Sequence, residues 1–244
     1  MLFGRIIRNL LVKVAKVDSR LTRRSFIVWT KEKSLARIRE LAVIPVVRVS
    51  SRQHVMCAVK GIIKGGINVV EITLTVPNAI SIIQELVAEY GAELLVGAGT
   101  VLDADSCRQA LLAGAEFIVS PAFDAEVVAM TRQRGKLAMP GALTPTEVLI
   151  AWNSGADLVK LFPCDSVGGA AYIRALKGPF PKIEFVVTGG VTIETAPELL
   201  AAGATAVGVG QSVMSQKALE CDDAAAIASS ARKFQEALQA ARRR

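Results

Sequence analysis

The strongest constraint on this chain is a structural unit that recurs eight times from about residue 42 onward. Each unit contains a short apolar run, a polar or Gly/Pro-rich turn, and a stretch whose apolar residues have helical spacing. Strands that alternate with helices indicate parallel pairing through right-handed crossovers. Eight such units within roughly 200 residues predict an α/β fold, the (β/α)8 TIM barrel. The apolar runs lie at 42–49, 68–74, 94–100, 116–121, 136–140, 157–162, 184–188 and 205–210.

The segments between these runs are predicted to be helices. They lie near 52–65, 78–90, 104–114, 124–134, 145–154, 169–177 and 193–202, and a final helix spans about 222–240. Residues 31–41 are expected to form a short helix across the bottom of the barrel. A doubly wound open sheet is the alternative arrangement. The count of eight, and the lack of a strong G-x-G-x-x-G motif after the first strand, favour the barrel.

Composition excludes several classes of protein. Apolar residues make up 52% of the chain and charged residues 21%, which excludes wholesale disorder. No apolar run approaches the ~18 residues of a membrane-spanning helix. His54 is the single histidine, and the four cysteines form no C-x-x-C pair, so we expect no metal site and no cofactor. Scattered free thiols suit a reducing, cytoplasmic setting.

The positive charge is concentrated in an N-terminal arm. The net charge is +7, and residues 1–30 alone account for +6. We therefore expect an arm over 1–30 and one barrel domain over 31–244, without nucleic-acid binding by the body. In the arm, apolar residues at helical spacing oppose basic ones, a pattern that favours a basic amphipathic helix able to contact an anionic membrane. The alternative is an extension without function.

Two charged side chains are predicted to point into the barrel. Strand alternation places Lys160 on the inner face of the sixth run and Glu71 on that of the second. Burial disfavours a charged amine, and a neutral lysine is the nucleophile that forms a Schiff base with a carbonyl. A structural Lys160–Glu71 ion pair is the alternative. Because active sites of this fold lie at the C-terminal strand ends, the pair is a candidate catalytic centre.

The neighbouring strand ends are expected to contribute space and a cation. In the third run, Val96, Ala98 and Thr100 are expected to share the inner face, where small residues leave room. Arg48 is expected at the top of the first strand.

The last two runs carry glycines suited to an anion. Run seven ends in Thr188-Gly189-Gly190, and run eight ends in Gly208-Val209-Gly210. Glycines let backbone N–H groups approach a phosphate, and the loops after strands seven and eight are the usual phosphate site of this fold. Glycines that serve only tight turns are the alternative.

A series of short motifs in this order resembles one enzyme family. From about residue 36 to 240 the chain resembles 2-keto-3-deoxy-6-phosphogluconate (KDPG) aldolase, which in many organisms also acts as 4-hydroxy-2-oxoglutarate (KHG) aldolase. The matching segments are VEITLTVPNA (70–79), VGAGTV (96–101), FIVSPAFD (117–124), MPGALTPTE (139–147), LVKLFP (158–163), ALKGPFP (175–181), VVTGGV (186–191) and AVGVG (206–210).

The resemblance implies a class I aldolase that forms homotrimers and uses no metal. By position, Lys160 corresponds to the Schiff-base lysine and Glu71 to the general acid/base. The remaining positions that the resemblance assigns are Thr100 for the substrate carboxylate, Pro121 and Phe162 for the pocket, and Gly189, Gly190 and Gly210 for the phosphate cradle.

Two positions depart from the family's pattern. Many members have an arginine that grips the substrate carboxylate where this chain has Thr75, and we expect Arg48 to supply the missing cation. The phosphate-binding serine after the last strand is replaced by Gln211, with Ser212 next.

The resemblance predicts a carbon–carbon lyase of the Entner–Doudoroff type. The expected reaction is reversible cleavage of 2-dehydro-3-deoxy-6-phosphogluconate to pyruvate and glyceraldehyde 3-phosphate. Cleavage of 4-hydroxy-2-oxoglutarate to pyruvate and glyoxylate is expected as a second activity. The alternatives are an aldolase for the galactonate epimer, another phosphate-binding barrel enzyme, and a catalytically retired barrel tethered by its basic arm.

Overall fold

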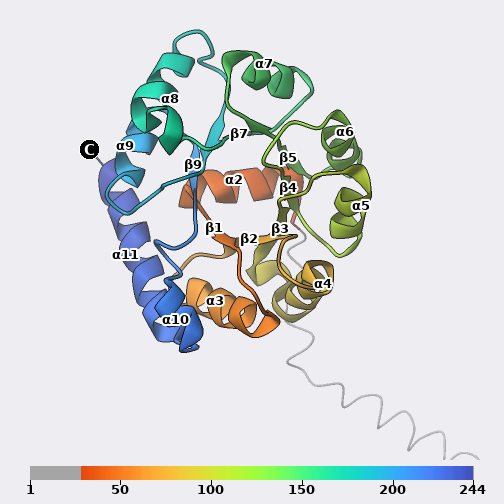
Figure 1. The fold of residues 1–244 in the computed structure, drawn as a ribbon, viewed down its shortest axis with the longest axis vertical. Helices are drawn as coiled ribbons and strands as arrows, with labels where there is room; N and C mark the ends of the chain where they lie inside the picture. The colour runs from red at the N-terminus through yellow and green to blue at the C-terminus, as the bar shows by residue number, and fades with distance from the viewer. Residues whose placement is uncertain (1–28, 244) are drawn as a thin grey trace, which may run out of the picture.

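The predicted parallel barrel is present in a computed structural model that describes residues 29–243. Its strands pair in the order β5-β4-β3-β2-β1-β9-β8-β7-β6, all of them parallel, and the helices surround them (Figure 1). The strands are β1 (Val43–Val47), β2 (Val69–Thr73), β3 (Leu95–Gly99), β4 (Phe117–Val119), β5 (Leu137–Met139), β6 (Gly141–Ala142), β7 (Val159–Leu161), β8 (Phe185–Val187) and β9 (Ala206–Val209).

The predicted fifth strand, 136–140, corresponds to β5, and a further short strand, β6, follows it directly after Pro140. Strand β5 pairs with β4, and β6 pairs with β7. Proline has no N–H to donate to a ladder, so the chain bends there at little cost. The eight predicted runs therefore correspond to eight of the nine assigned strands, and β6 lies beyond the predicted range.

The helices lie close to their predicted ranges. They are α2 (Lys31–Leu41), α3 (Arg52–Lys64), α4 (Ala79–Tyr90), α5 (Ala104–Leu112), α6 (Ala125–Gln133), α7 (Pro145–Asn153), α8 (Gly169–Lys177), α9 (Ala196–Ala201), α10 (Gln216–Glu220) and α11 (Ala224–Arg242), with 3-10 turns at Gly91–Glu93 and Asp165–Val167. The short helix α10 was not predicted, because five residues carry too little periodicity to distinguish a helix from a loop.

Side-chain caps fix where several barrel helices begin. Ser51, Asp103 and Asp124 each accept a hydrogen bond from the backbone three residues later. At α7 the cap is reciprocal, because Thr144 accepts from the backbone of Glu147 while the Glu147 carboxylate accepts from the backbone of Thr144. These caps set the position of each loop between a strand and the following helix.

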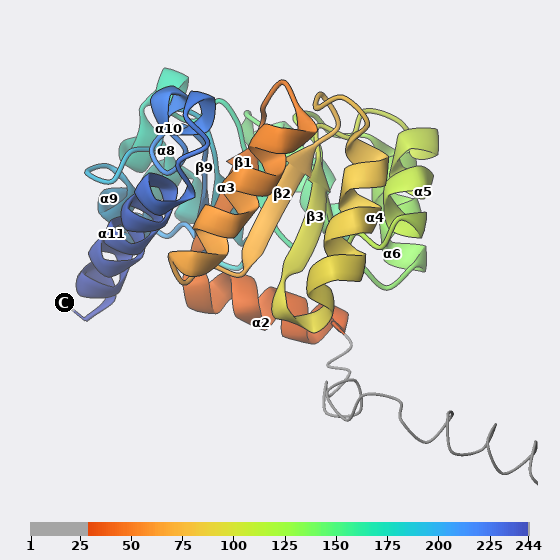
Figure 2. The ribbon, with the colours of Figure 1, turned by 90° about the horizontal axis from the view of Figure 1, so that it is seen from below.

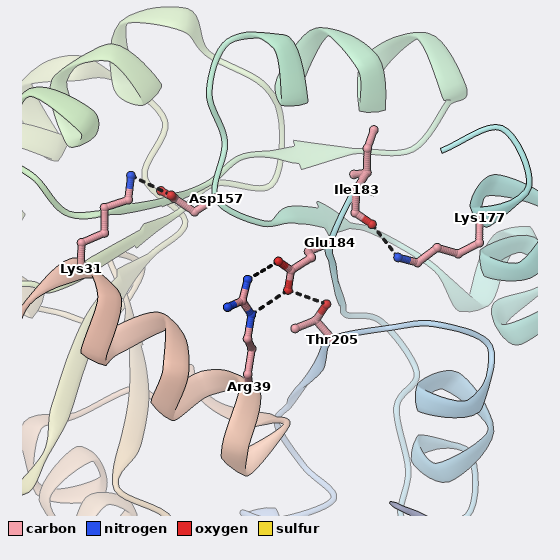
Figure 3. Close-up of polar contacts among 7 residues, drawn as sticks. All are labelled: Lys31, Arg39, Asp157, Lys177, Ile183, Glu184 and Thr205. Carbon is pink, nitrogen blue, oxygen red and sulfur yellow. Dashed lines mark hydrogen bonds and ion pairs between the residues drawn. The ribbon is translucent and has the colours of Figure 1, made fainter. Parts of the chain in front are cut away.

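Helix α2 closes one end of the barrel, as expected (Figure 2). Its own residues Ile38 and Leu41 are buried. On its polar side, Arg39 pairs with Glu184, which also accepts a hydrogen bond from Thr205, and Lys31 pairs with Asp157 at 2.7 Å (Figure 3). These contacts join α2 to loops at the N-terminal strand ends. This end of the barrel therefore serves stability and leaves the opposite end for a site.

The expectation that Val96 and Ala98 face the barrel interior is wrong. Gly97 pairs with Glu71 in the β2–β3 ladder and shares its face. A Cβ atom on Gly99 would lie only 1.8 Å from the Glu71 carboxylate, so Gly99 also faces inward. Val96 and Ala98 are buried against the helix layer instead. Both faces of a parallel strand are buried, so apolar character does not tell the inner face from the outer one.

The basic arm predicted over residues 1–30 falls almost entirely outside the described residues. Among residues 29–243, no helix has the length and apolar character needed to cross a membrane.

Candidate active site

Lys160 lies at the centre of β7, inside the barrel and 5% exposed. Its neighbours in the ladder are Gly141 and Val186, which add no polar group beside the amine. The Nζ atom lies 5.0 Å from the centre of the Phe162 ring. The amine therefore sits in a largely apolar environment at the C-terminal ends of the strands.

Glu71 lies at the centre of β2 and is 2% exposed. Its Oε1 atom is buried and has no hydrogen-bond partner in the described part of the chain. The side chain fits there because Gly99 has no Cβ. Among the described residues, no hydrogen bond or ion pair at contact distance joins Glu71 to Lys160. The structure therefore does not contain the ion pair that a purely structural role would need.

Burial pushes both catalytic candidates toward their neutral forms. It lowers the pKa of Lys160, and the positive charge of Arg48 adds to this while the charge of Glu71 opposes it. Burial also raises the pKa of Glu71, against the attraction of Lys160 and Arg48. A lysine that loses its proton easily can attack a carbonyl, and a carboxyl group near its transition can both donate and accept a proton.

Arg48 and Thr100 meet above this pair. Arg48 is exposed just beyond β1, and its Nη2 atom donates to the Thr100 hydroxyl over 3.2 Å. Thr100 has a φ of 56°, so the chain turns sharply at the end of β3 and brings the hydroxyl back toward the site. Thr75 lies just beyond β2, and its hydroxyl is 2.8 Å from that of Thr73. A guanidinium and hydroxyls in this arrangement can bind a carboxylate.

Pro121 and Phe162 both lie near β6 and β7. Phe162 directly follows β7, and its ring centre lies 5.0 Å from the Lys160 amine. A Cβ atom on Gly141 would lie 2.2 Å from the Pro121 carbonyl, so the loop after β4 passes closely over β6. The structure thus places Phe162 beside the lysine and Pro121 beside Gly141, the ladder neighbour of Lys160.

The predicted phosphate residues surround a cleft of about 370 Å³ that is also lined by Val46, the ladder partner of Glu71. Its lining includes Thr188, Gly189, Gly190, Gly210 and Gln211. Gly189 and Gly190 have positive φ angles of 100° and 62°. The Thr188 hydroxyl is buried without a partner among the described residues, so a polar ligand would satisfy it.

The two glycines also have a packing role. A Cβ atom on Gly189 or Gly190 would lie within 2.9 Å of the Asp165 carboxylate. The glycines therefore form a tight turn and also border the cleft, and phosphate binding there stays a prediction.

A second cavity, which the sequence did not predict, adjoins the site. It has a volume of about 450 Å³ and lies between β1, the start of α3 and α10. The partly buried His54, the buried Met214 and the exposed Glu220 all line it. The sequence signal was weak because the cavity depends on α10, which was not recognised.

Comparison with known proteins identifies one family. The family described as KDPG and KHG aldolase matches residues 35–230. A 2-dehydro-3-deoxy-phosphogluconate aldolase of Treponema pallidum (strain Nichols) is 37% identical over 168 residues, which cover 69% of this chain and 78% of that protein. A KHG/KDPG aldolase of Escherichia coli (strain K12) is 30% identical over 181 residues, which cover 74% of this chain and 84% of that protein.

Solved structures give the same result. A structure described as native KDPGal has a TM-score of 0.77 and 30% identity, and the match covers 84% of this chain and 98% of that one. A KDPG aldolase of Legionella pneumophila, with pyruvate captured as a covalent carbinolamine, has a TM-score of 0.76 and 26% identity over 82% of this chain and 96% of that one. A protein cage designed by fusing symmetric oligomeric domains matches with a TM-score of 0.77 and 30% identity over 84% of this chain and 74% of its own.

Proposed function

The chain belongs to the KDPG and KHG aldolase family, and from that premise we propose that it is a class I aldolase in which Lys160 forms the Schiff base. The substrate is a 2-keto-3-deoxy sugar acid, with 2-dehydro-3-deoxy-6-phosphogluconate and 4-hydroxy-2-oxoglutarate as the expected members. The observation that carries the assignment is a buried lysine of lowered pKa beside an unpartnered buried glutamate.

The reaction begins at the amine of Lys160. Its neutral form attacks the C2 ketone, and loss of water gives an iminium. Arg48 and Thr100 bind the substrate carboxylate and so orient the ketone toward the amine. The exposed position of Thr75 leaves it room to add a hydrogen bond to the same carboxylate.

Glu71 transfers the protons in both the bond-breaking and the product-release steps. It removes the C4 hydroxyl proton, and the C3–C4 bond breaks as its electrons pass into the iminium. The aldehyde leaves and an enamine of pyruvate remains on the lysine. Glu71 then returns a proton to the enamine carbon, and hydrolysis releases pyruvate. The raised pKa of Glu71 suits a group that must both accept and donate.

The aldehyde half extends away from Lys160 toward the glycine cleft. Backbone N–H groups of Gly189, Gly190 and Gly210 bind the terminal phosphate, and the Gln211 amide donates in place of the family's serine. The Thr188 hydroxyl gains in the complex the partner that it lacks. Pro121 and Phe162 exclude water from the imine on the opposite side.

Pyruvate release tests this proposal. The wild-type protein should release pyruvate from 2-dehydro-3-deoxy-6-phosphogluconate in a lactate dehydrogenase assay. Glu71→Gln should lower kcat by about 100-fold or more, because it removes the proton carrier with little change in volume. Glu236→Gln, an exposed carboxylate on α11, is the matched control and should leave kcat unchanged. Equal activity of Glu71→Gln and wild type would refute the assigned role.

The same assay separates the candidate substrates. Comparison of kcat/KM for the gluconate compound, its galactonate epimer and 4-hydroxy-2-oxoglutarate identifies the preferred one. Similarity to a structure described as KDPGal is the reason to include the epimer.

We also propose that the protein assembles as a homotrimer. Support comes from the similar chain used in a cage of fused symmetric oligomeric domains, and from exposed apolar side chains at Leu102, Leu112, Leu149 and Ile150. Sedimentation equilibrium should give three times the chain mass, and Ile150→Glu should lower it. A wild-type monomer at micromolar concentration would contradict this assembly.

A further inference from the structure

The cavity between β1, α3 and α10 shares Arg48, Gly210 and Gln211 with the mechanism above, but its wall from His54 to Glu220 has no part in that mechanism. It holds about 450 Å³, enough for a ligand fragment of several carbons. One side of it is Val46, which pairs with Glu71 in the β1–β2 ladder and shares its inward face. Arg48 also borders it, and its charge acts on both Lys160 and Glu71. The cavity therefore opens beside the catalytic pair.

The walls of this cavity combine an apolar floor with a polar rim. Val46, Met214 and Leu219 supply the apolar part. Gln211, His54 and Glu220 supply groups that donate or accept hydrogen bonds. A hydroxylated carbon chain fits this combination, because its C–H face packs on the floor while its hydroxyls reach the rim.

Glu220 decides which ligand end the cavity accepts. Glu220 is exposed at the rim, where its Oε1 atom accepts a hydrogen bond from the Gln216 amide over 2.8 Å that orients the carboxylate. The second oxygen remains available to accept from a ligand hydroxyl. A carboxylate in the wall repels a phosphate dianion, so the cavity favours an uncharged end.

Two cavities therefore adjoin Val46, the ladder partner of Glu71. The glycine cleft is lined by backbone and small side chains, and the second cavity is lined by Glu220 and His54. Both are lined by Val46, Gly210 and Gln211, which places Gln211 between them.

We propose that the cavity beside Glu220 binds the uncharged, hydroxyl-bearing end of an unphosphorylated 2-keto-3-deoxy sugar acid. The protein thereby accepts a second class of substrate, with the phosphorylated end bound in the glycine cleft and the unphosphorylated end in the cavity. This inference rests on the aldolase function proposed above.

The test compares two substrates that differ only in the phosphate. The kcat/KM for pyruvate release is measured with 2-keto-3-deoxygluconate and with its 6-phosphate. Wild type should cleave both. Glu220→Ala should lower kcat/KM about tenfold for the unphosphorylated acid, which is the effect of one lost hydrogen bond to a charged group, and less than twofold for the phosphate. Glu236→Ala on α11 is the matched control and should change neither.

A second variant keeps the test independent of Glu220. Ser50 is exposed on the rim of the cavity, so Ser50→Leu adds volume there without disturbing the core. Ser50→Leu should also lower kcat/KM for the unphosphorylated substrate more than for the 6-phosphate. The inference would be overturned if kcat/KM fell equally for both substrates or for neither. It would also be overturned if the wild-type protein did not cleave 2-keto-3-deoxygluconate.

Reductive trapping of pyruvate distinguishes failure of the cavity inference from failure of the proposed aldolase function. A pyruvate adduct on Lys160 in wild type, together with no selective effect of either variant, rejects the cavity and retains the aldolase. Absence of the adduct rejects the proposed function itself.

Discussion

At the scale of single residues, the site depends on two ionisable groups held in an apolar interior. Lys160 is 5% exposed and Glu71 2% exposed, and neither makes a contact ion pair within the described residues. Such groups reduce stability, because burial penalises their charged forms. They lie at a position where altered protonation serves the chemistry proposed above.

Replacing Lys160 with methionine should stabilise the fold. The pKa of Lys160 is lowered in the folded protein below its value of 10.5 in a free chain, so the unfolded state binds more protons between the two values. Wild-type stability therefore rises with pH across that interval. Lys160→Met should raise the free energy of unfolding by about 1–2 kcal/mol at pH 7. Urea unfolding should show this gain shrinking toward pH 10, whereas a gain that widens with pH would contradict the argument.

Gly99→Ala should damage the site without touching either catalytic residue. The new Cβ would lie 1.8 Å from the Glu71 carboxylate, which must then move. We expect kcat to fall about 100-fold and the unfolding free energy to fall by about 1–3 kcal/mol. Pyruvate release and thermal unfolding measure the two effects. Gly178→Ala is the control, because the nearest atom to its Cβ lies 3.5 Å away, and equal behaviour of the two variants would disprove the steric account.

At this scale the sequence predicted which charged side chains face the barrel interior, but it did not predict the orientation of the strand beside them. The charged side chains of Lys160 and Glu71 mark the inner face of their strands, because charge is rare in a parallel sheet. Gly97 and Gly99 carry no such mark, so the orientation of β3 was assigned wrongly. Thr100 nevertheless reaches the site, since its positive φ redirects the chain beyond the strand. That turn is set by the fold and has no signal in residue alternation.

At the scale of elements, the packing of α11 on α3 positions one wall of the site. Gly61 and Gly65 let the two helices approach closely, because a Cβ on either would overlap Ile227 or Ala231. Helix α3 begins with the segment that carries His54. The last helix of the chain therefore holds the first barrel helix against the strands.

Gly61→Ala should weaken this contact. The added methyl would lie 2.6 Å from the Ile227 Cβ and 2.8 Å from the Ala224 carbonyl oxygen. Overpacking of this kind costs about 1–3 kcal/mol, more than the roughly 1 kcal/mol that alanine gains over glycine within a helix. Urea unfolding should therefore give a lower midpoint than wild type. An unchanged or higher midpoint would show that the helices can separate freely.

The sequence predicted the number and order of elements because each apolar run is bounded by turn residues. It did not predict α10 or the short strand β6 that follows Pro140. Both depend on where neighbouring strands and helices lie in space. The cavity beside α10 was missed for the same reason.

At the scale of the whole molecule, the two ends of the barrel have different tasks. One end is closed by α2 and its pairs Arg39–Glu184 and Lys31–Asp157. Arg242 at the end of α11 donates to the carbonyls of Arg39 and Glu40, which fastens the last helix to the same cap. The opposite end carries the clefts and the catalytic candidates. Stability and chemistry thus occupy separate faces of one domain.

Removal of residues 1–28 should leave the aldolase intact. The barrel residues that form the core and the site all lie within 29–243. We expect unchanged kcat/KM and thermal midpoint, whereas sedimentation with anionic lipid vesicles should be lost if the basic arm contacts membranes. Loss of activity in the shortened protein would show that the arm contributes to the barrel. Equal sedimentation of both forms would refute the membrane contact.

The most direct measurement of the central claim is borohydride reduction in the presence of pyruvate, followed by intact mass and peptide mapping. The account predicts one trapped pyruvate per chain, on the peptide that contains Lys160. Lys177 is the internal control, because burial also lowers its pKa but its amine donates to the Ile183 carbonyl outside the site. Lys177→Met should retain the adduct and Lys160→Met should lose it. No adduct on folded protein at several pH values, or an adduct on another lysine, would contradict the Schiff-base mechanism.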